Sequence, residues 1–210
     1  MSVTFPLTFP TITGIAKATL RKKSIVAQSN SPFTGISQTQ VFPGQWWEGE
    51  ITLPPFVSRA SFETWMAFLL SLNGKEGTFL FGDPAGKTPR GIATGTPLVN
   101  GASQSGGSLI TDGWTVSQTG ILLAGDWIQL GTSSTARLYK VLADANSDGT
   151  GNATFDIWPN LRGNLIPADN DPLVVQSAQG LFRLATNEQS WNLSPTPVYS
   201  GITFPIKEAI

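Results

Sequence analysis

The chain has 210 residues and contains neither histidine nor cysteine. Without imidazole or thiolate groups it cannot carry a Ser–His or Cys–His nucleophile pair, a zinc site built from those ligands, or a disulfide. The net charge is −1 and 40% of the residues are hydrophobic, which indicates a folded protein. Only 13% of the residues are charged, so the surface is mainly uncharged and polar, which suits assembly or sugar contacts.

Charge and hydropathy patterns argue against two further classes of protein. Nucleic-acid binders carry a basic face, whereas the only basic run here is Arg21-Lys22-Lys23, which we interpret as a solvated strand end or a guarded edge strand. No apolar window approaches about eighteen residues, so we expect no membrane span. The first ten residues lack a basic region followed by an apolar run, so we expect no secretory signal and synthesis in a cytoplasm.

Short strands joined by turns are predicted for the first part of the chain, because glycine and proline recur about every ten residues. Pro43-Gly44 predicts a hairpin turn, and residues 29–35 predict a loop. After the turn, apolar and polar side chains alternate with the period of a half-buried strand. The strands expected here are 12–20, 24–29, 38–42, 46–53 and 77–81.

One helix is predicted, with its start at Ser58 or Ser61 and its end at Asn73-Gly74. Its apolar residues recur at the helical spacing i, i+3, i+4, i+7, i+8, and an aromatic stripe of this kind belongs to a core more often than to a cofactor site. We expect the helix to lie across a sheet. The stripe consists of Phe62, Trp65, Met66, Leu69 and Leu70.

A second β unit is predicted after about residue 90, where charged and aromatic residues become rare before the strands resume. Five or six short strands suffice for a small barrel or sandwich. The segments after residue 176 again resemble the first unit. We therefore expect a parent domain of residues 1–90 plus 176–210 with residues 91–175 inserted. The strands expected in this part are 109–110, 121–123, 126–130, 136–142, 154–158, 173–175, 180–185, 188–192 and 201–206.

The strongest metal signal is the segment containing Asp144, Asn146 and Asp148, which matches the front of a calcium-loop pattern. The pattern needs a glutamate at its twelfth position, where this chain has Phe155. The same residue types favour a turn. We interpret the segment as a hairpin loop, with a weak calcium site as the alternative; no cofactor is expected.

Carboxylates and tryptophans offer two further candidate sites. Glu48 and Glu50 share one strand face, and two such carboxylates can flank a glycosidic bond, although a polar sheet surface is the simpler interpretation. Trp127 and Trp158 would form the platform of a carbohydrate-binding module. Most of the seven tryptophans are expected in a core or an interface. Trp46, opposite in direction to Trp47, is the one expected at a surface or subunit contact.

Several segments in succession resemble the distal tail protein (Dit-like) family of long-tailed, non-contractile bacteriophages. The likeness extends over nearly the whole chain, in order, and no single motif in it is a chemical signature. It is carried by VFPGQWWEGEITLPP (41–55), WMAFLLSLNGKEGTFLFGDP (65–84), GDWIQLG (125–131), RLYKVLADANSDGTGNATFDIWP (137–159), GLFRLATNEQSW (180–191) and GITFPIKEAI (201–210).

The resemblance implies a β-sandwich belt domain with one helix and an inserted β-barrel or β-sandwich module, galectin- or OB-like. It also implies a structural virion protein and not an enzyme. Its subunits would form a hexameric ring that joins the tail tube protein to the tail-tip hub and its receptor-binding proteins. DNA would pass as cargo through a channel in the ring. The belt core or ring contacts would then contain Trp46, Trp47, Trp65, Phe79 and Phe81. The alternatives are a carbohydrate-binding module for host attachment and a carboxylate glycosidase.

Overall fold

Two five-stranded sheets and one α-helix make up most of the regular structure in this computed structural model, which describes residues 3–12, 14–162, 166–192 and 199–210. A short 3-10 turn, Ser133–Thr135, accompanies them. The predicted all-β fold with a single α-helix is therefore confirmed. No helix among the described residues is long and apolar enough to span a membrane.

The first sheet combines strands from the two ends of the chain, in the order β1-β2-β10-β9-β3. All its neighbouring strands are antiparallel. The last strand in sequence, β10, lies between β2 and β9, so the C-terminal segment closes a sheet begun near the N-terminus. The strands are β1 (Lys17–Asn30), β2 (Ser37–Thr52), β3 (Phe79–Phe81), β9 (Gly180–Leu184) and β10 (Thr203–Glu208).

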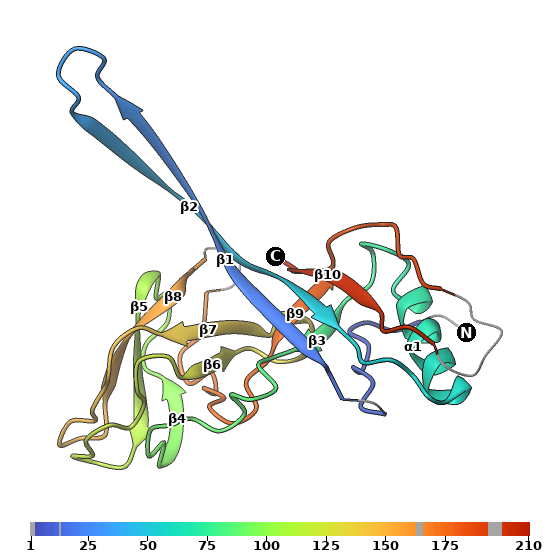
Figure 1. Cartoon of the computed structure of the whole chain (residues 1–210). Helices are drawn as coiled ribbons and strands as arrows, with labels where there is room; N and C mark the ends of the chain where they lie inside the picture. Colours follow the sequence, from blue (N-terminus) through green and yellow to red (C-terminus); the bar gives the residue numbers. More distant parts are fainter. Residues whose placement is uncertain (1–2, 13, 163–165, 193–198) are drawn as a thin grey trace.

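One face of the first sheet forms the main core. Trp47 and Ile51 of β2 point inward and are buried, as their alternation with polar residues predicts. Helix α1 (Arg59–Ser71) packs on this face, and its N-cap is Ser58, one of the two predicted caps. Phe9 of the N-terminal segment fits between helix and sheet, with its ring 5.1 Å from that of Trp65. The helix thus covers one face of the sheet, as expected (Figure 1).

The second sheet has the order β4-β5-β8-β7-β6 and curls into an open half-barrel. All its strands come from one continuous stretch of chain, and their inward side chains, such as Leu109 and Phe155, form a second core cluster. Pro172 and Val174 lie against this sheet through isolated bridges to Leu98 and Gln129, and Leu122 forms a bridge with Ala145 in the connection between β7 and β8. The strands are β4 (Gly95–Val99), β5 (Gly106–Trp114), β6 (Trp127–Leu130), β7 (Arg137–Val141) and β8 (Ala153–Leu161).

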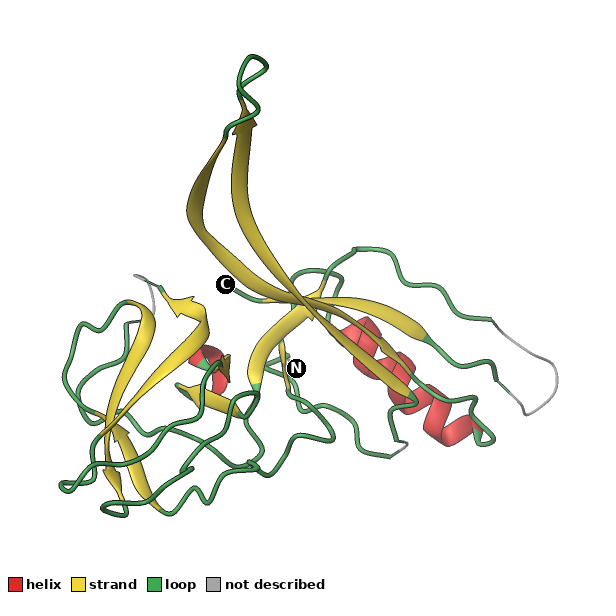
Figure 2. Cartoon of the chain, turned by 60° about the vertical axis from the view of Figure 1, so that its left-hand side comes forward, coloured by secondary structure: helices red, strands yellow, loops and turns green. Residues whose placement is uncertain are grey.

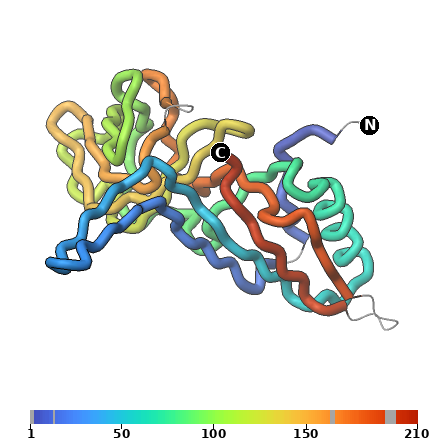
Figure 3. Tube along the Cα trace, turned by 90° about the horizontal axis from the view of Figure 1, so that it is seen from above, coloured from blue at the N-terminus to red at the C-terminus, as the bar shows by residue number. Residues whose placement is uncertain are grey.

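The first sheet lies between helix α1 and the second sheet, so the body of the molecule is elongated (Figure 3). The two sheets are not separate cores. Trp127 of β6 and Leu138 of β7 belong to the main core cluster with Trp47, and Trp158 of β8 packs against that cluster. At this junction, side chains of β6, β7 and β8 meet Trp47 and the end of β10. We call the junction the seam. The predicted insertion of 91–175 into a parent domain remains a prediction.

The predicted hairpin turn at Pro43-Gly44 is wrong. Strand β2 continues through these residues without a turn. Strand β1 is likewise one continuous strand, although separate strands were expected at 12–20 and 24–29. The turn that joins β1 to β2 lies at residues 31–36 instead. In the ladder, Ser24 pairs with Gln45 but Val26 pairs with Val41, so Pro43 and Gly44 lie in a β-bulge. A bulge tolerates proline because its residues make no regular ladder hydrogen bond.

Four smaller predictions also need correction. Leu70, placed in the buried helical stripe, is 64% exposed, and Phe68 is buried in its place. Residues 121–123 and 173–175 form only isolated bridges, and 188–192 form no strand. Strand β4 was not predicted because it lies within a glycine-rich stretch, where the sequence shows no clear alternation of apolar and polar residues.

Candidate assembly interface

The outer part of the β1–β2 hairpin projects from the body with no other segment beside it (Figures 1 and 2). We call residues 24–44 the arm. All of its residues except Ser31 and Gly44 are classed as exposed, although its two strands pair from Ser24 to Asn30 and from Ser37 to Gln45. The outer edges of this ribbon carry unpaired N–H and C=O groups, which can accept a strand from another chain.

The side chains of the arm make it an unusual surface. Residues 24–44 include no charged residue. All six of its large apolar side chains are exposed, and Phe33 at the tip is 94% exposed. Exposed strands are usually protected from association by charged side chains. This ribbon lacks that protection beyond its base. The apolar side chains are Ile25, Val26, Phe33, Ile36, Val41 and Phe42.

The tip is an ordered turn. The N–H of Ser31 donates to the carbonyl of Ile36, and the N–H of Gly35 donates to the carbonyl of Ser31, both at 2.9 Å. The Ser31 hydroxyl also accepts the N–H groups of Phe33 and Thr34. Gly35 has a φ of +71°, which the turn requires and which glycine adopts without strain. Phe33 is therefore presented on a folded loop.

The arm is rooted at the seam. The backbone N–H of Trp47 donates to the Glu208 carboxylate at 3.1 Å, and its indole N–H donates to the Leu138 carbonyl at 3.0 Å. The ring of Trp47 meets those of Trp158 and Trp127 edge-on, with centroids 4.4 and 5.1 Å away. One side chain thus joins the arm to both sheets.

A buried group of charges lies beside this root. The Glu208 carboxylate is 3.6 Å from the Arg162 guanidinium, and Arg137 and Tyr139 line the same small hollow. Burial raises the pKa of Glu208 although the Trp47 N–H and the arginines lower it. Burial, with a contribution from Glu208, raises the pKa of Tyr139 to about 12. These groups hold the two sheets together, because a buried charge requires its partner.

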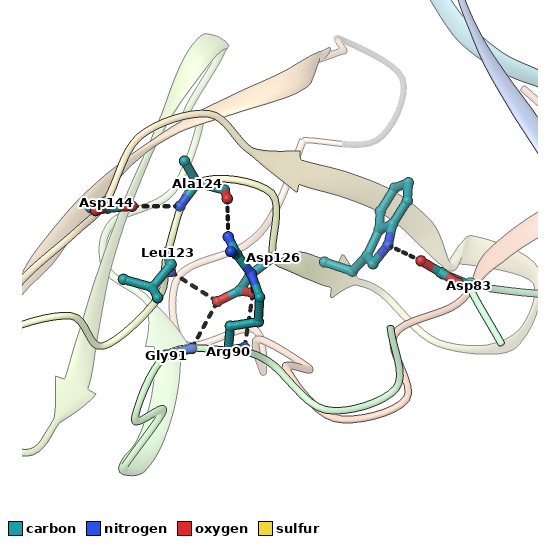
Figure 4. A network of polar contacts seen from close by, with 8 residues as sticks. Asp83, Arg90, Gly91, Leu123, Ala124, Asp126 and Asp144 are labelled. Atoms are coloured by element: carbon teal, nitrogen blue, oxygen red, sulfur yellow. Dashed lines mark hydrogen bonds and ion pairs between the residues drawn. The ribbon is translucent and has the colours of Figure 1, made fainter. Parts of the chain in front are cut away.

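A polar network fixes the connection between the sheets (Figure 4). Asp126 accepts the backbone N–H groups of Arg90, Gly91 and Leu123 at 2.8–3.1 Å. The Arg90 side chain forms an ion pair with Asp126 and donates to the carbonyl of Ala124. Burial opposes ionisation of Asp126, but these donors and the Arg90 charge together hold its pKa below its ordinary value. The network fastens the chain entering the second unit to the turn before β6.

A groove of about 710 Å³ opens on the body beside β3 and the N-terminal segment. A smaller hollow of about 310 Å³ adjoins it and shares Ile15, Phe81, Asp83 and Pro84 with it. The carboxylate of Asp83 is held by the indole N–H of Trp127 at 3.0 Å and by the N–H of Ala85. Among the described residues, Asp83 is the one carboxylate that lines these two hollows.

The three residues of the calcium-like segment carry out separate structural tasks. Asp144 accepts the N–H of Ala124, Asn146 accepts the N–H of Gly120, and Asp148 accepts the N–H groups of Thr150 and Asn152. These bonds hold the pKa of Asp148 at about 2. Within the described ranges, no three acidic side chains are grouped closely enough to hold a metal ion. Asp144 and Asn146 thus tie their loop to residues 120–124, whereas Asp148 accepts bonds within its own turn.

The other candidate residues occupy two different environments. Trp47, Trp65, Phe79 and Phe81 lie in the main core cluster. Trp46 lies on the opposite sheet face, where it donates to Glu48 at 2.8 Å and where the Lys207 ammonium lies 4.6 Å from its ring centre.

The proposed sugar platform is not open. Trp127 is buried, with the Lys140 ammonium 3.6 Å from its ring centre, and Trp158 packs edge-on against Trp47. Glu48 and Glu50 share the exposed side of β2, opposite Arg21 and Thr19. The nominated carboxylates thus lie on one face of β2, and the nominated tryptophans Trp127 and Trp158 lie in or against the main core cluster. At the root of the arm, Trp47 faces the seam, whereas Trp46 and Glu48 lie on the opposite face of β2.

The arm itself was not found from the sequence. Its signals are a stretch of 21 residues without a charge and two β-prone segments of similar length on either side of SPFTG. Because a turn was predicted at Pro43-Gly44, the two segments were not recognised as the two strands of one long hairpin.

A comparison of the sequence with protein-family models and with curated proteins found no match. The geometry of the chain itself must therefore support any functional proposal.

Proposed function

We propose that this chain is a structural protein of a bacteriophage tail tip, a distal tail protein whose subunits join into a ring between the tail tube and the tail-tip hub. The observation that carries the proposal is the arm. It is a long, uncharged ribbon with six exposed apolar side chains, and its base is tied to the second sheet by the indole of Trp47. The sequence resemblance supplies the identity of the assembly.

The arm is better suited to a complex than to an isolated molecule. A two-stranded ribbon alone is marginally stable in water, because it buries little apolar surface. Burial of an apolar side chain contributes about 1.5–3 kcal/mol, so covering Phe33, Val41 and their neighbours would stabilise an assembly substantially. Exposed apolar groups on an unguarded ribbon indicate a partner surface. We infer that a neighbouring subunit supplies that surface.

A projecting arm also gives a contact of the right symmetry. The arm of one subunit and the surface that receives it are different parts of the chain, so the contact is heterologous. Repetition of such a contact closes into a ring when the rotation between subunits is a whole fraction of a turn. The proposed ring is hexameric, contacts the tail tube protein and the hub, and leaves a channel for DNA. It requires no catalytic residue or cofactor.

The test compares the complete chain with a variant in which residues 25–43 are replaced by an Asn-Gly turn. Light scattering should give a mass near six times 22.4 kDa for the complete chain and one subunit for the variant. The variant should keep its folded circular-dichroism spectrum, because no buried side chain is removed. Electron micrographs should show rings for the complete chain alone.

A pair of single substitutions provides a matched control. Phe33→Ser removes the exposed aromatic ring at the arm tip, whereas Val57→Ser removes an apolar side chain that is 84% exposed outside the arm. We expect weaker assembly from the first and wild-type assembly from the second. A complete chain that stays monomeric and also fails to bind purified tail tubes would overturn the proposed function.

A further inference from the structure

The groove beside β3 has apolar walls that come from two neighbouring segments. Leu7 and Ile15 belong to the N-terminal segment, and Leu80 and Phe81 belong to β3. The backbone N–H of Leu7 donates to the carbonyl of Thr78 at 2.8 Å, which holds the two walls side by side. With a volume of about 710 Å³, the groove can accept an aromatic side chain together with its neighbours. We call it the β3 groove.

The charged groups at the β3 groove are either already bonded or in contact with water. Among the described residues that line it, Asp83 and Lys87 carry a charge. Burial opposes the ionisation of the Asp83 carboxylate, but the Trp127 indole and Ala85 backbone N–H groups that donate to it hold its pKa below its ordinary value. Lys87 is exposed. Because an unpaired charge is costly to bury, the groove favours an uncharged and partly apolar occupant.

The tip of the arm has the properties of such an occupant. Residues 31–36 carry no charge, and the Phe33 ring among them is 94% exposed. The hydrogen bonds of Ser31 fix the turn, so the tip loses little conformational entropy when it binds. A rigid aromatic side chain inserted in an apolar pocket is a common anchor of protein–protein interfaces.

The β3 groove and the arm tip lie at opposite ends of strand β1. Ile15, just before the strand, lines the groove, whereas the arm begins at Ser24 and continues away from it. The strand has 14 residues, so at about 3.3 Å per residue its two ends are roughly 40 Å apart. Figures 1 and 3 show the arm extending from one end of β1 and the N-terminal segment beside the other. The tip of a molecule therefore cannot enter the groove of the same molecule.

We propose that the arm tip of one molecule docks in the β3 groove of a second copy, with the Phe33 ring against the apolar walls. This inference rests on the proposed function, and it identifies the surface of the neighbouring subunit that receives the arm. Because the tip and the groove are different surfaces, each molecule inserts one arm and accepts another. A head-to-tail contact of this kind is heterologous, and its repetition can close a ring.

A crosslinking experiment tests the contact directly, because the full-length chain contains no cysteine and introduced thiols are its only ones. Thr34→Cys places a thiol at the arm tip, and Thr8→Cys places one at the rim of the β3 groove; both threonines are exposed. A short bis-maleimide crosslinker should convert the double variant into a ladder of covalent products, up to the six subunits of the proposed ring.

Two controls show whether the ladder reports this contact. Each single variant should give no product larger than a pair, because a chain with one thiol can be joined to only one other chain. Thr34→Cys/Ala102→Cys is the matched double variant, with its second thiol on the exposed connection between β4 and β5. It should give no ladder.

A groove-filling substitution tests whether the contact supports assembly. Gly14 lines the β3 groove, and a Cβ added there meets nothing within 4 Å. Gly14→Trp should occupy the groove and weaken association in sedimentation by at least about tenfold, the loss expected when an aromatic anchor is excluded from its pocket. Gly149→Trp is the matched control, because Gly149 is equally open but lies in the connection between β7 and β8. It should associate as the wild type does.

These results separate the inference from the proposed function. Absence of a ladder from Thr34→Cys/Thr8→Cys, or normal association of Gly14→Trp, overturns docking in the β3 groove, provided that circular dichroism shows folded variants. Rings that still depend on the arm would then leave the proposed function intact, with the arm bound elsewhere on the neighbouring subunit. A wild type that stays monomeric and fails to bind tail tubes overturns the proposed function and this inference together.

Discussion

Asp126 shows how much structure a single carboxylate can determine. It is 3% exposed, yet its pKa is lowered, because three backbone N–H groups and Arg90 outweigh the cost of burial. Those donors come from two segments about thirty-five residues apart in the sequence. The sequence places Asp126 at the start of a strand, but nothing local to it indicates these partners. Long-range hydrogen bonds of this kind are the part of a site that periodicity does not predict.

Asp126→Asn should destabilise the protein by about 2–3 kcal/mol at neutral pH, since hydrogen bonds to a charged acceptor contribute about 1.5–3 kcal/mol. The ionised form stabilises the fold because its folded pKa lies below the ordinary 3.8. That contribution is complete above pH 3.8 and is lost as the pH falls through the lowered folded pKa. Urea unfolding at several pH values should show the difference between the two proteins shrinking in acid.

Asp144→Asn is the matched control for that experiment. Asp144 is exposed and accepts a single backbone N–H, that of Ala124. The substitution should change the free energy of unfolding by less than about 0.5 kcal/mol. A difference for Asp126→Asn that stayed constant down to strongly acid pH would show that its charge contributes nothing.

At the scale of elements, the sequence predicted the second half of strand β2 correctly, but it predicted a turn where the first half continues. From Trp46 to Leu53 the alternation of side chains is strict, and the structure buries the expected face. At Pro43-Gly44 the local turn chemistry is genuine, but pairing with β1 converts it into a bulge. Turn propensity is a local preference of roughly 1 kcal/mol, whereas a continuous ladder gains from every pair along it.

Gly49 tests the close packing at the centre of the first sheet. It pairs with Leu20 of β1 and with Ile206 of β10. A Cβ added there would lie 2.3 Å from the carbonyl oxygen of Thr19, so the backbone would have to move. Gly49→Ala should cost about 2 kcal/mol or more, the range of overpacked cores.

Gly149→Ala provides the comparison, because its added Cβ meets nothing within 4 Å and its φ is not positive. Its free energy of unfolding should stay within about 0.5 kcal/mol of the wild type or rise slightly. Chemical denaturation of both variants measures the difference. Equal stabilities for the two would mean that the sheet centre is looser than the contact distances indicate.

At the scale of the whole molecule, composition and periodicity predicted the all-β class and the helix on a sheet. They did not predict that β10 inserts between β2 and β9, since strand order depends on contacts between segments about 150 residues apart. They also did not reveal the seam. Trp47 was expected in a core or a ring contact, but its bonds to β7 and β10 depend on how the two sheets meet.

Trp47→Ala is the substitution that tests whether the two sheets fold as one unit. It removes the edge-on contacts with Trp127 and Trp158 and the hydrogen bond to Leu138, and it should cost about 3–5 kcal/mol, as large aromatic deletions do. Because this side chain is shared by both sheets, its loss weakens the coupling between them. The wild type should unfold in one transition seen equally by circular dichroism and tryptophan fluorescence. The variant should show two, the second sheet keeping its own core around Leu109 and Phe155. Coincident transitions in the variant would mean that the remaining contacts, above all Arg162 with Glu208, are sufficient to couple the sheets.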